Sequence, residues 1–135
     1  MGTGNFIKCN KCSYEKEFML GWGMLYGDFE RVVSFLDKKN RDKALKVMKE
    51  HHPNYSFKFD GRTLFQCRKC YSVNENEYIA IWDKEKKLIF RTYSECKKCK
   101  IKRRKLPMKN ELVQEFHCPK CKTDDVEIYP GMMWD

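Results

Sequence analysis

The chain has 135 residues, a formal net charge of +9 and eight cysteines. A chain of this length forms one domain or two very small modules, and modules of that size bury too little apolar surface to fold on a hydrophobic core alone. No apolar run approaches the ~18 residues of a membrane span, and no signal peptide precedes the first cysteine. We therefore expect no membrane association and a cytoplasmic protein whose thiols stay reduced.

The first predicted elements are two short strands on either side of the turn "KCNKC". From Asp28 the apolar residues recur at helical spacing, with Phe29, Val32, Val33 and Leu36 on one face. A second helix follows, with Asn40 as its expected N-cap, and ends before Pro53. The pattern predicts one helical insertion at about residues 28–52.

The remaining chain reads as strands. The segment "YSFKFDGRTLFQC" alternates apolar and polar residues around Asp60-Gly61, which predicts a hairpin turn there. A second hairpin joins "EYIAIW" to "KLIFRTY", and the last strands are "LVQEFHC" and "DVEIY". The predicted fold class is a small metal-stabilised α+β protein, in which β-hairpins carry the metal sites.

All eight cysteines fall into C-x-x-C pairs: Cys9/Cys12, Cys67/Cys70, Cys96/Cys99 and Cys118/Cys121. Zinc binds four ligands in a tetrahedron, and two such turns supply them. Four turns using every cysteine therefore predict two zinc ions, each in a closed four-cysteine site. A closed site leaves no position for a substrate or an activated water, which favours a structural role for the metal.

The spacing leaves open which turns share a metal. A sequential pairing joins the first turn to the second and the third to the fourth, across 54 and 18 intervening residues. A nested pairing joins the two middle turns across 25 residues and the two outer turns across 105. Loop-closure entropy favours the sequential pairing by only ~0.9 kcal/mol.

Three segments resemble a known family. The segment "CKKC" followed after 18 residues by "CPKC" resembles a zinc ribbon, and so does "LFQCRKC" with "ECKKC". The opening "KCNKCSYEKEF" is similar to a rubredoxin-type knuckle, with Ser13 where that family usually has glycine. The opening with "EFMLGWGM" also resembles small bacterial zinc-ribbon proteins that have no assigned activity. The resemblance implies a zinc-ribbon module with the helical insertion over residues 1–93 and a C-terminal zinc ribbon over 94–135.

Positive charge is concentrated in one quarter of the chain. Residues 91–122 hold eleven Lys and Arg against three Glu. The densest part is a basic run within and beyond the third turn: Lys97, Lys98, Lys100, Lys102, Arg103, Arg104 and Lys105. A rigid metal turn would hold these charges together, which predicts contact with nucleic acid or a nucleoprotein complex. The alternative is a solvated face that offsets the charge of a nearby metal-thiolate site.

Two other functions remain open. Apolar segments 19–29 and 129–134 suit a protein-interaction module, such as a regulator or inhibitor that docks on a larger nucleoprotein or enzyme. Iron also accepts four thiolates, so rubredoxin-like electron transfer is a third, weaker hypothesis for the function. His51, His52 and His117 form no set with a nucleophile and an orienting group, and no catalytic residue is predicted. We expect a protein that is not an enzyme.

Overall fold

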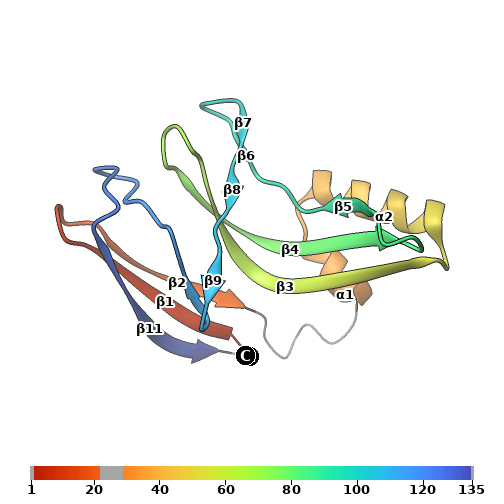
Figure 1. Ribbon diagram of the computed structural model, residues 1–135, viewed down its shortest axis with the longest axis horizontal. Coiled ribbons are helices and arrows are strands. Elements are labelled where there is room, and N and C mark those ends of the chain that lie inside the picture. Colours follow the sequence, from red (N-terminus) through yellow and green to blue (C-terminus); the bar gives the residue numbers. More distant parts are fainter. Residues whose placement is uncertain (1, 22–28, 135) are drawn as a thin grey trace.

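In the computed structural model, which describes residues 2–21 and 29–134, the chain is mostly β, with its helices between the second and third strands (Figure 1). The elements in chain order are β1 (Gly2–Cys9), β2 (Glu15–Gly21), α1 (Phe29–Ser34), α2 (Lys38–His51), β3 (Tyr55–Gln66), β4 (Val73–Asp83), β5 (Leu88–Arg91), β6 (Glu95–Cys96), β7 (Ile101–Lys102), β8 (Arg104–Lys105), β9 (Met108–Lys109), β10 (Leu112–Val113) and β11 (Val126–Trp134). The long strands form one antiparallel sheet in the order β11-β1-β2-β3-β4-β5, and β8 pairs with β3 as its seventh strand.

The long hairpin of β3 and β4 connects the two halves of this sheet. The two strands pair from Tyr55 with Asp83 to Gln66 with Val73. The predicted turn at Asp60-Gly61 is wrong, because β3 runs through it as a single strand with a register shift between Phe59 and Gly61. Gly61 has a φ of 78°, a conformation that serves a β-bulge as well as a tight turn.

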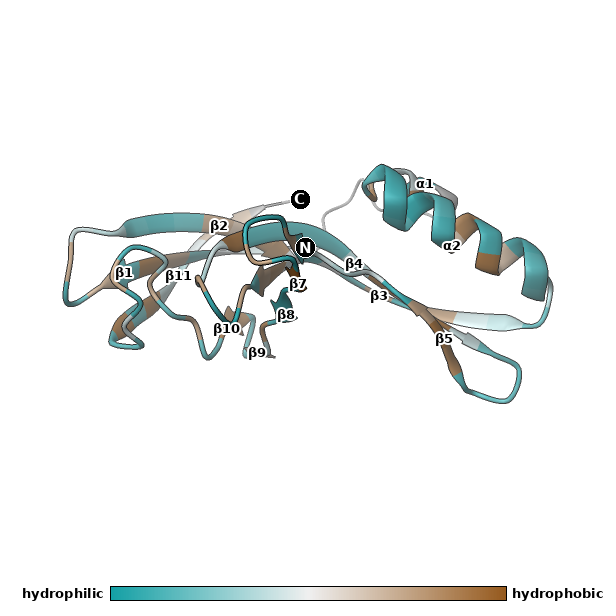
Figure 2. Cartoon of the chain, turned by 90° about the horizontal axis from the view of Figure 1, so that it is seen from above, coloured by the Kyte–Doolittle hydropathy of each residue, from teal (hydrophilic) through white to brown (hydrophobic). Residues whose placement is uncertain are grey.

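Helices α1 and α2 pack over β3, β4 and β5, at one end of the molecule (Figure 2). Their shared core is apolar: Val32, Val33, Leu36, Ala44, Ile79, Ile81 and Phe90 are buried together. The helical insertion is confirmed, but the N-cap of α2 is Asp37, whose Oδ1 accepts the Asn40 N–H at 2.9 Å. The Asn40 side chain is bound instead to the backbone of Tyr93, where it ties α2 to the chain beyond β5.

A second core lies under the other half of the sheet. It contains Ile7, Phe18, Leu20, Leu64, Leu106, Val113 and Phe116. Buried Asn5 fixes the segment that covers this core, because it accepts the Val113 N–H at 2.7 Å and donates to the Glu111 carbonyl at 3.1 Å. Short strands β9 and β10 belong to this covering segment.

The mostly β character predicted from the sequence is confirmed. Seven of the strands make one continuous sheet, and β6 with β7 and β9 with β10 form two separate two-stranded sheets, whereas the sequence led us to expect separate hairpin ribbons. Within residues 2–21 and 29–134, no helix has the length and apolar character that crossing a membrane requires.

Candidate metal centres and basic cleft

Each C-x-x-C pair forms a tight turn, termed a knuckle. The four knuckles lie at the same end of the strands, along the upper side of the molecule in Figure 1. Two of them connect β1 to β2 and β3 to β4, the third connects β6 to β7, and the fourth precedes β11. The sheet therefore gathers cysteines that are far apart in the sequence.

The sulfur atoms form two groups of four, each with all sulfurs within 4.8 Å of one another. The outer group consists of Cys9, Cys12, Cys118 and Cys121, and the inner group of Cys67, Cys70, Cys96 and Cys99. The nested pairing is therefore the one present, and the sequential pairing that loop entropy favoured is wrong. Each group takes two cysteines from each of the predicted modules, 1–93 and 94–135, whose boundary stays a prediction.

The spacing of the sulfurs suits a tetrahedral metal ion. Cys9 and Cys12 lie 3.5 Å from Cys121 and Cys118 respectively, and Cys70 lies 3.6 Å from Cys96. A tetrahedron with metal–sulfur distances of ~2.3 Å has edges of roughly 3.8 Å. A disulfide would need ~2.05 Å, and all eight cysteines are free. The two groups could each hold one metal ion.

The backbone of the knuckles is shaped for sulfur ligation. Tyr71, Lys100 and Lys122 each follow the second cysteine of a knuckle and have φ between 58° and 66°. This left-handed residue lets its own N–H reach back to the first cysteine's carbonyl, as Lys122 does to Cys118 at 2.7 Å. Other N–H groups point at sulfur, such as that of Lys11 at 3.3 Å from Cys9 Sγ. Donors of this kind favour the thiolate.

The thiols in each group differ in pKa. A hydrogen bond with Ser72, together with the Cys99 N–H, lowers the pKa of Cys96 to about 6. Burial raises the pKa of Cys9, but N–H groups of Lys11 and Cys12 outweigh it and bring it to about 7. Desolvation and the neighbouring sulfurs raise the pKa of Cys99 to about 12. Four adjacent thiolates repel one another, so complete ionisation of a group calls for a bound cation.

The inner group has a further set of polar contacts around its sulfurs. Ser72 Oγ lies 3.3 Å from Cys70 Sγ and 3.4 Å from Cys96 Sγ. The Arg103 guanidinium donates to this hydroxyl at 3.2 and 3.3 Å, and also to Ser94 Oγ and the Glu95 carbonyl. Arg103 therefore holds Ser72 beside two of the inner sulfurs and brings a positive charge to this side of the inner group.

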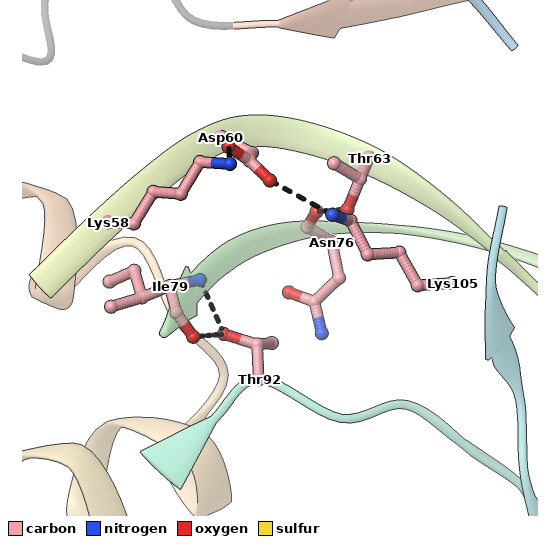
Figure 3. Close-up of polar contacts among 7 residues, drawn as sticks. All are labelled: Lys58, Asp60, Thr63, Asn76, Ile79, Thr92 and Lys105. Atoms are coloured by element: carbon pink, nitrogen blue, oxygen red, sulfur yellow. Dashed lines mark hydrogen bonds and ion pairs between the residues drawn. The ribbon is translucent and has the colours of Figure 1, made fainter. Parts of the chain in front are cut away.

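The predicted basic run divides into two sets. Lys97, Lys98, Lys100 and Lys102 are exposed, whereas Arg103, Arg104 and Lys105 are half-buried. Arg104 pairs with Glu115 at 3.0 Å. Lys105 pairs with Asp60 at 2.9 Å (Figure 3). Its Nζ also lies over the Tyr78 ring. The second set is therefore engaged within the protein, and the first set faces solvent.

Beside this run lies a cavity of about 370 Å³, termed the basic cleft. Its lining contains six basic side chains and no carboxylate: Phe65, Arg68, Tyr78, Arg91, Thr92, Tyr93, Lys102, Arg103, Arg104 and Lys105. Sequence reasoning left Arg68 and Arg91 out of the candidate site, because Arg68 lies in another knuckle and Arg91, although counted in the basic quarter 91–122, lies outside the run 97–105. Only the pairing of β3 with β4 and β8, and of β4 with β5, brings them to the run.

Other predicted residues have structural positions. The ring of His117 stacks on Tyr71 at 4.6 Å between centroids and belongs to neither cysteine group. Of the apolar segment 19–29, residues 22–28 lie outside the described part of the chain, and Leu20 is buried in the core. In the segment 129–134, Tyr129, Met132 and Met133 are exposed on β11.

The two four-cysteine groups define the chain as a candidate metal-binding protein. Comparison with protein-family models, with curated proteins and with solved structures finds no match. Any more particular assignment therefore depends on the residues of this chain.

Proposed function

We propose that the protein is a structural zinc protein related to zinc ribbons, and that it binds nucleic acid through the basic surface around residues 97–105. On this proposal it is a binding protein and not an enzyme. Each cysteine group would hold one zinc ion, and the ion would offset the repulsion among four thiolates. With both sites formed, each contributes a charge of −2, and the net charge is then +5.

Zinc is the better candidate than iron on chemical grounds. Both metals accept four thiolates, but zinc has no redox chemistry and serves where a closed site only stabilises a fold. Elemental analysis of the purified protein should find two zinc ions per chain, with no visible absorption from a thiolate–iron band. A coloured protein that contains iron would support electron transfer instead.

The observation that carries the nucleic-acid proposal is the exposed set of lysines on the third knuckle. Within the described residues, the side chains of Lys97, Lys98 and Lys100 form no ion pair, and the knuckle fixes their positions around the inner group. Charges that serve only to offset the metal site would be expected to lie against it, as Arg103 does. Three solvent-facing lysines on a rigid turn suit a phosphate backbone.

The test is a variant with Lys97, Lys98 and Lys100 changed to Gln. We expect unchanged zinc content and melting temperature, because these side chains are exposed and form no ion pair among the described residues. Affinity for nucleic acid should fall, and the slope of log affinity against log salt should become shallower by roughly 2 to 3, since each phosphate contact releases about 0.7 to 0.9 counterions. Fluorescence anisotropy over a range of salt concentrations measures both.

The matched control changes Lys49, Lys84 and Lys87 to Gln. These lysines are also exposed, in α2 and in the turn between β4 and β5, at the far end of the sheet (Figure 1). The control should bind nucleic acid like the unaltered protein. Equal losses of affinity in the two variants, or no binding of nucleic acid by the unaltered protein, would show that the third knuckle is only a solvated face.

One observation favours a second candidate, the protein-interaction module. Met132 and Met133 expose 68% and 60% of their surface on β11, which ends the sheet order. Methionine is an adaptable contact residue at protein interfaces. Changing both to Ser should leave nucleic-acid binding intact and remove any partner that co-purifies through this strand.

A further inference from the structure

Resting on the proposed function, we propose that the basic cleft is the site for an unpaired stretch of nucleic acid, and that it selects single strands over duplexes. The proposal adds two residues, Arg68 and Arg91, that lie outside the run around 97–105. It also names the kind of nucleic acid that the surface takes.

The charge of the cleft is assembled from separate parts of the fold. Arg68 comes from the second knuckle, Arg91 from the end of β5, and Lys102 and Arg104 from β7 and β8. Arg68 and Arg91 are exposed and form no ion pair among the residues that the structure describes. A hollow lined by six basic side chains attracts a polyanion. Arg104 and Lys105 already pair with Glu115 and Asp60, so Arg68 and Arg91 are among the cations left to meet the closely spaced charges of a phosphodiester strand.

The shape of the cleft argues for an unpaired strand. A volume of about 370 Å³ is at the small end of sites that enclose a ligand, so the cleft has room for one nucleotide unit. A duplex keeps its bases stacked inside and presents a convex outer surface, which cannot fill a small hollow. A single strand bends freely and can place a sugar or a base inside while its phosphates meet the rim.

The inner surface of the cleft provides apolar and aromatic contacts. Phe65 and Thr92 are both 2% exposed, and Tyr78 and Tyr93 also line the cleft. Lys102 Nζ lies 5.0 Å from the centroid of the Tyr93 ring, and Lys105 Nζ lies 3.9 Å from that of Tyr78. Each ring is thus next to an ammonium group. This combination matches a nucleotide, whose sugar and base are joined to a phosphate.

The cleft is built before any ligand arrives. The Thr92 hydroxyl accepts the Ile79 N–H at 3.0 Å, which holds the base of the cleft on β4 (Figure 3). Arg103 is held by Ser72, Ser94 and the Glu95 carbonyl beside the inner group. Side chains that are already held in place lose little conformational entropy on binding, so less of the binding free energy is spent on ordering them.

The experiment compares the zinc-loaded protein with a variant in which Arg68 and Arg91 are changed to Gln, and with a K49Q/K84Q control. The probes are a short oligothymidylate and a hairpin duplex of similar charge, both followed by fluorescence anisotropy. Two phosphate contacts release about 1.4 counterions, so the cleft variant should bind oligothymidylate roughly 10- to 30-fold more weakly at 0.1 M salt. The control variant should bind both probes like the unaltered protein, and duplex binding should change less than threefold in the cleft variant.

The outcomes separate this inference from the proposed function. An equal loss of affinity for both probes in the cleft variant would overturn the single-strand site. So would unchanged affinity of the cleft variant for both probes when the Lys97/Lys98/Lys100 variant binds nucleic acid more weakly. In either case the proposed function stands. If neither probe binds the unaltered protein, both fail. Zinc content and melting temperature of the cleft variant should match those of the control, and a misfolded cleft variant is replaced by the single changes R68Q and R91Q.

Discussion

The two cysteine groups have the same ligands but different surroundings. The inner group takes both knuckles from neighbouring hairpins in the middle of the chain and has Ser72 and Arg103 beside its sulfurs. The outer group joins knuckles from near the two ends of the chain, and its Cys121 is exposed. Around the outer group the polar contacts lie at the surface, such as Lys120 with Ser13 and Lys11 with Asp125.

The difference shows why loop length did not decide the pairing. The outer ligands are separated by 105 residues, yet β1 and β11 pair from Gly2 with Trp134 to Cys9 with Val126. The sheet therefore brings the outer knuckles together. Strand pairing offsets part of the entropic cost of closing that loop, so metal binding would not have to offset all of it. An estimate from loop length alone ignores this contribution.

The largest expected effect comes from removing ligands in pairs. The variant C9S/C118S alters one group and should retain one metal ion, whereas C9S/C67S alters both groups and should retain none. Because a structural zinc ion contributes an apparent ~10–16 kcal/mol to folding, C9S/C67S should be unfolded. Elemental analysis and circular dichroism measure the two results.

The single variant C9S is the control, with one ion retained. Under the sequential pairing C9S/C67S would retain one metal ion and C9S/C118S would retain none. A C9S/C67S protein that is folded and holds one ion would therefore contradict the nested arrangement.

The next largest effect is a difference between the two groups in the pH at which each releases its metal. A thiol whose pKa in the fold is below its ordinary value of 9.0 contributes stability that is present at high pH and is lost as the pH falls through the lowered pKa. That pKa is about 6 for Cys96 and about 7 for Cys9. The inner group should therefore keep its metal to a lower pH than the outer group, as followed by a chromophoric chelator during acid titration.

The variants C99S and C118S isolate the outer and inner groups for this titration. Changing Ser72 to Ala in the C118S background should weaken inner binding about 10- to 100-fold, as expected for a hydrogen-bond partner of a metal ligand. It should also move acid release to a higher pH. Identical release curves for C99S and C118S would show that the polar contacts of the inner group have no effect on its metal.

The smallest effects come from the cations beside each group. Changing Arg103 to Gln removes charged hydrogen bonds to Ser72, Ser94 and Glu95 and should cost about 1.5–3 kcal/mol in the free energy of unfolding. Changing Lys120 to Gln removes an exposed contact with Ser13 and should cost less than about 0.5 kcal/mol. Urea unfolding of the zinc-loaded proteins gives both values. Equal losses would remove the distinction between a supported group and an exposed one.

Local patterns predicted the local structure well. The helical spacing that begins at Val32 and Val33 and the alternation in "EYIAIW" each depend on residues close together in the sequence, and both elements are present. Helix α1 ends at Ser34, so Leu36, which the same spacing included, lies in the turn that follows it. Asp60-Gly61 was misread because a positive φ at glycine serves a turn and a bulge alike. Here the strand partners in β4 decided between them, and they lie far along the sequence.

The candidate sites depend on the pairing of strands that are far apart in the chain, and local sequence patterns do not reveal that pairing. Cysteine count and spacing predicted two groups of four, but only the register of β1 with β11 determined their membership. The basic run was visible as composition, whereas its division into exposed and engaged residues depends on Asp60 and Glu115, which come from other segments. Arg68 and Arg91 lie outside the run 97–105, and only the pairing of the strands brings them beside it.

The pairing of β1 with β11 also sets an order of assembly during synthesis. All four inner ligands have left the ribosome once Cys99 has emerged, and β3, β4 and β5 are then complete. The outer group must wait for Cys121, and the free edge of β1 must wait for Val126 and the residues after it. Because chains fold from the N-terminus as they emerge, a metal ion at the inner group would be bound before one at the outer group. Until Cys118 and Cys121 emerge, Cys9 and Cys12 form only half of the outer group.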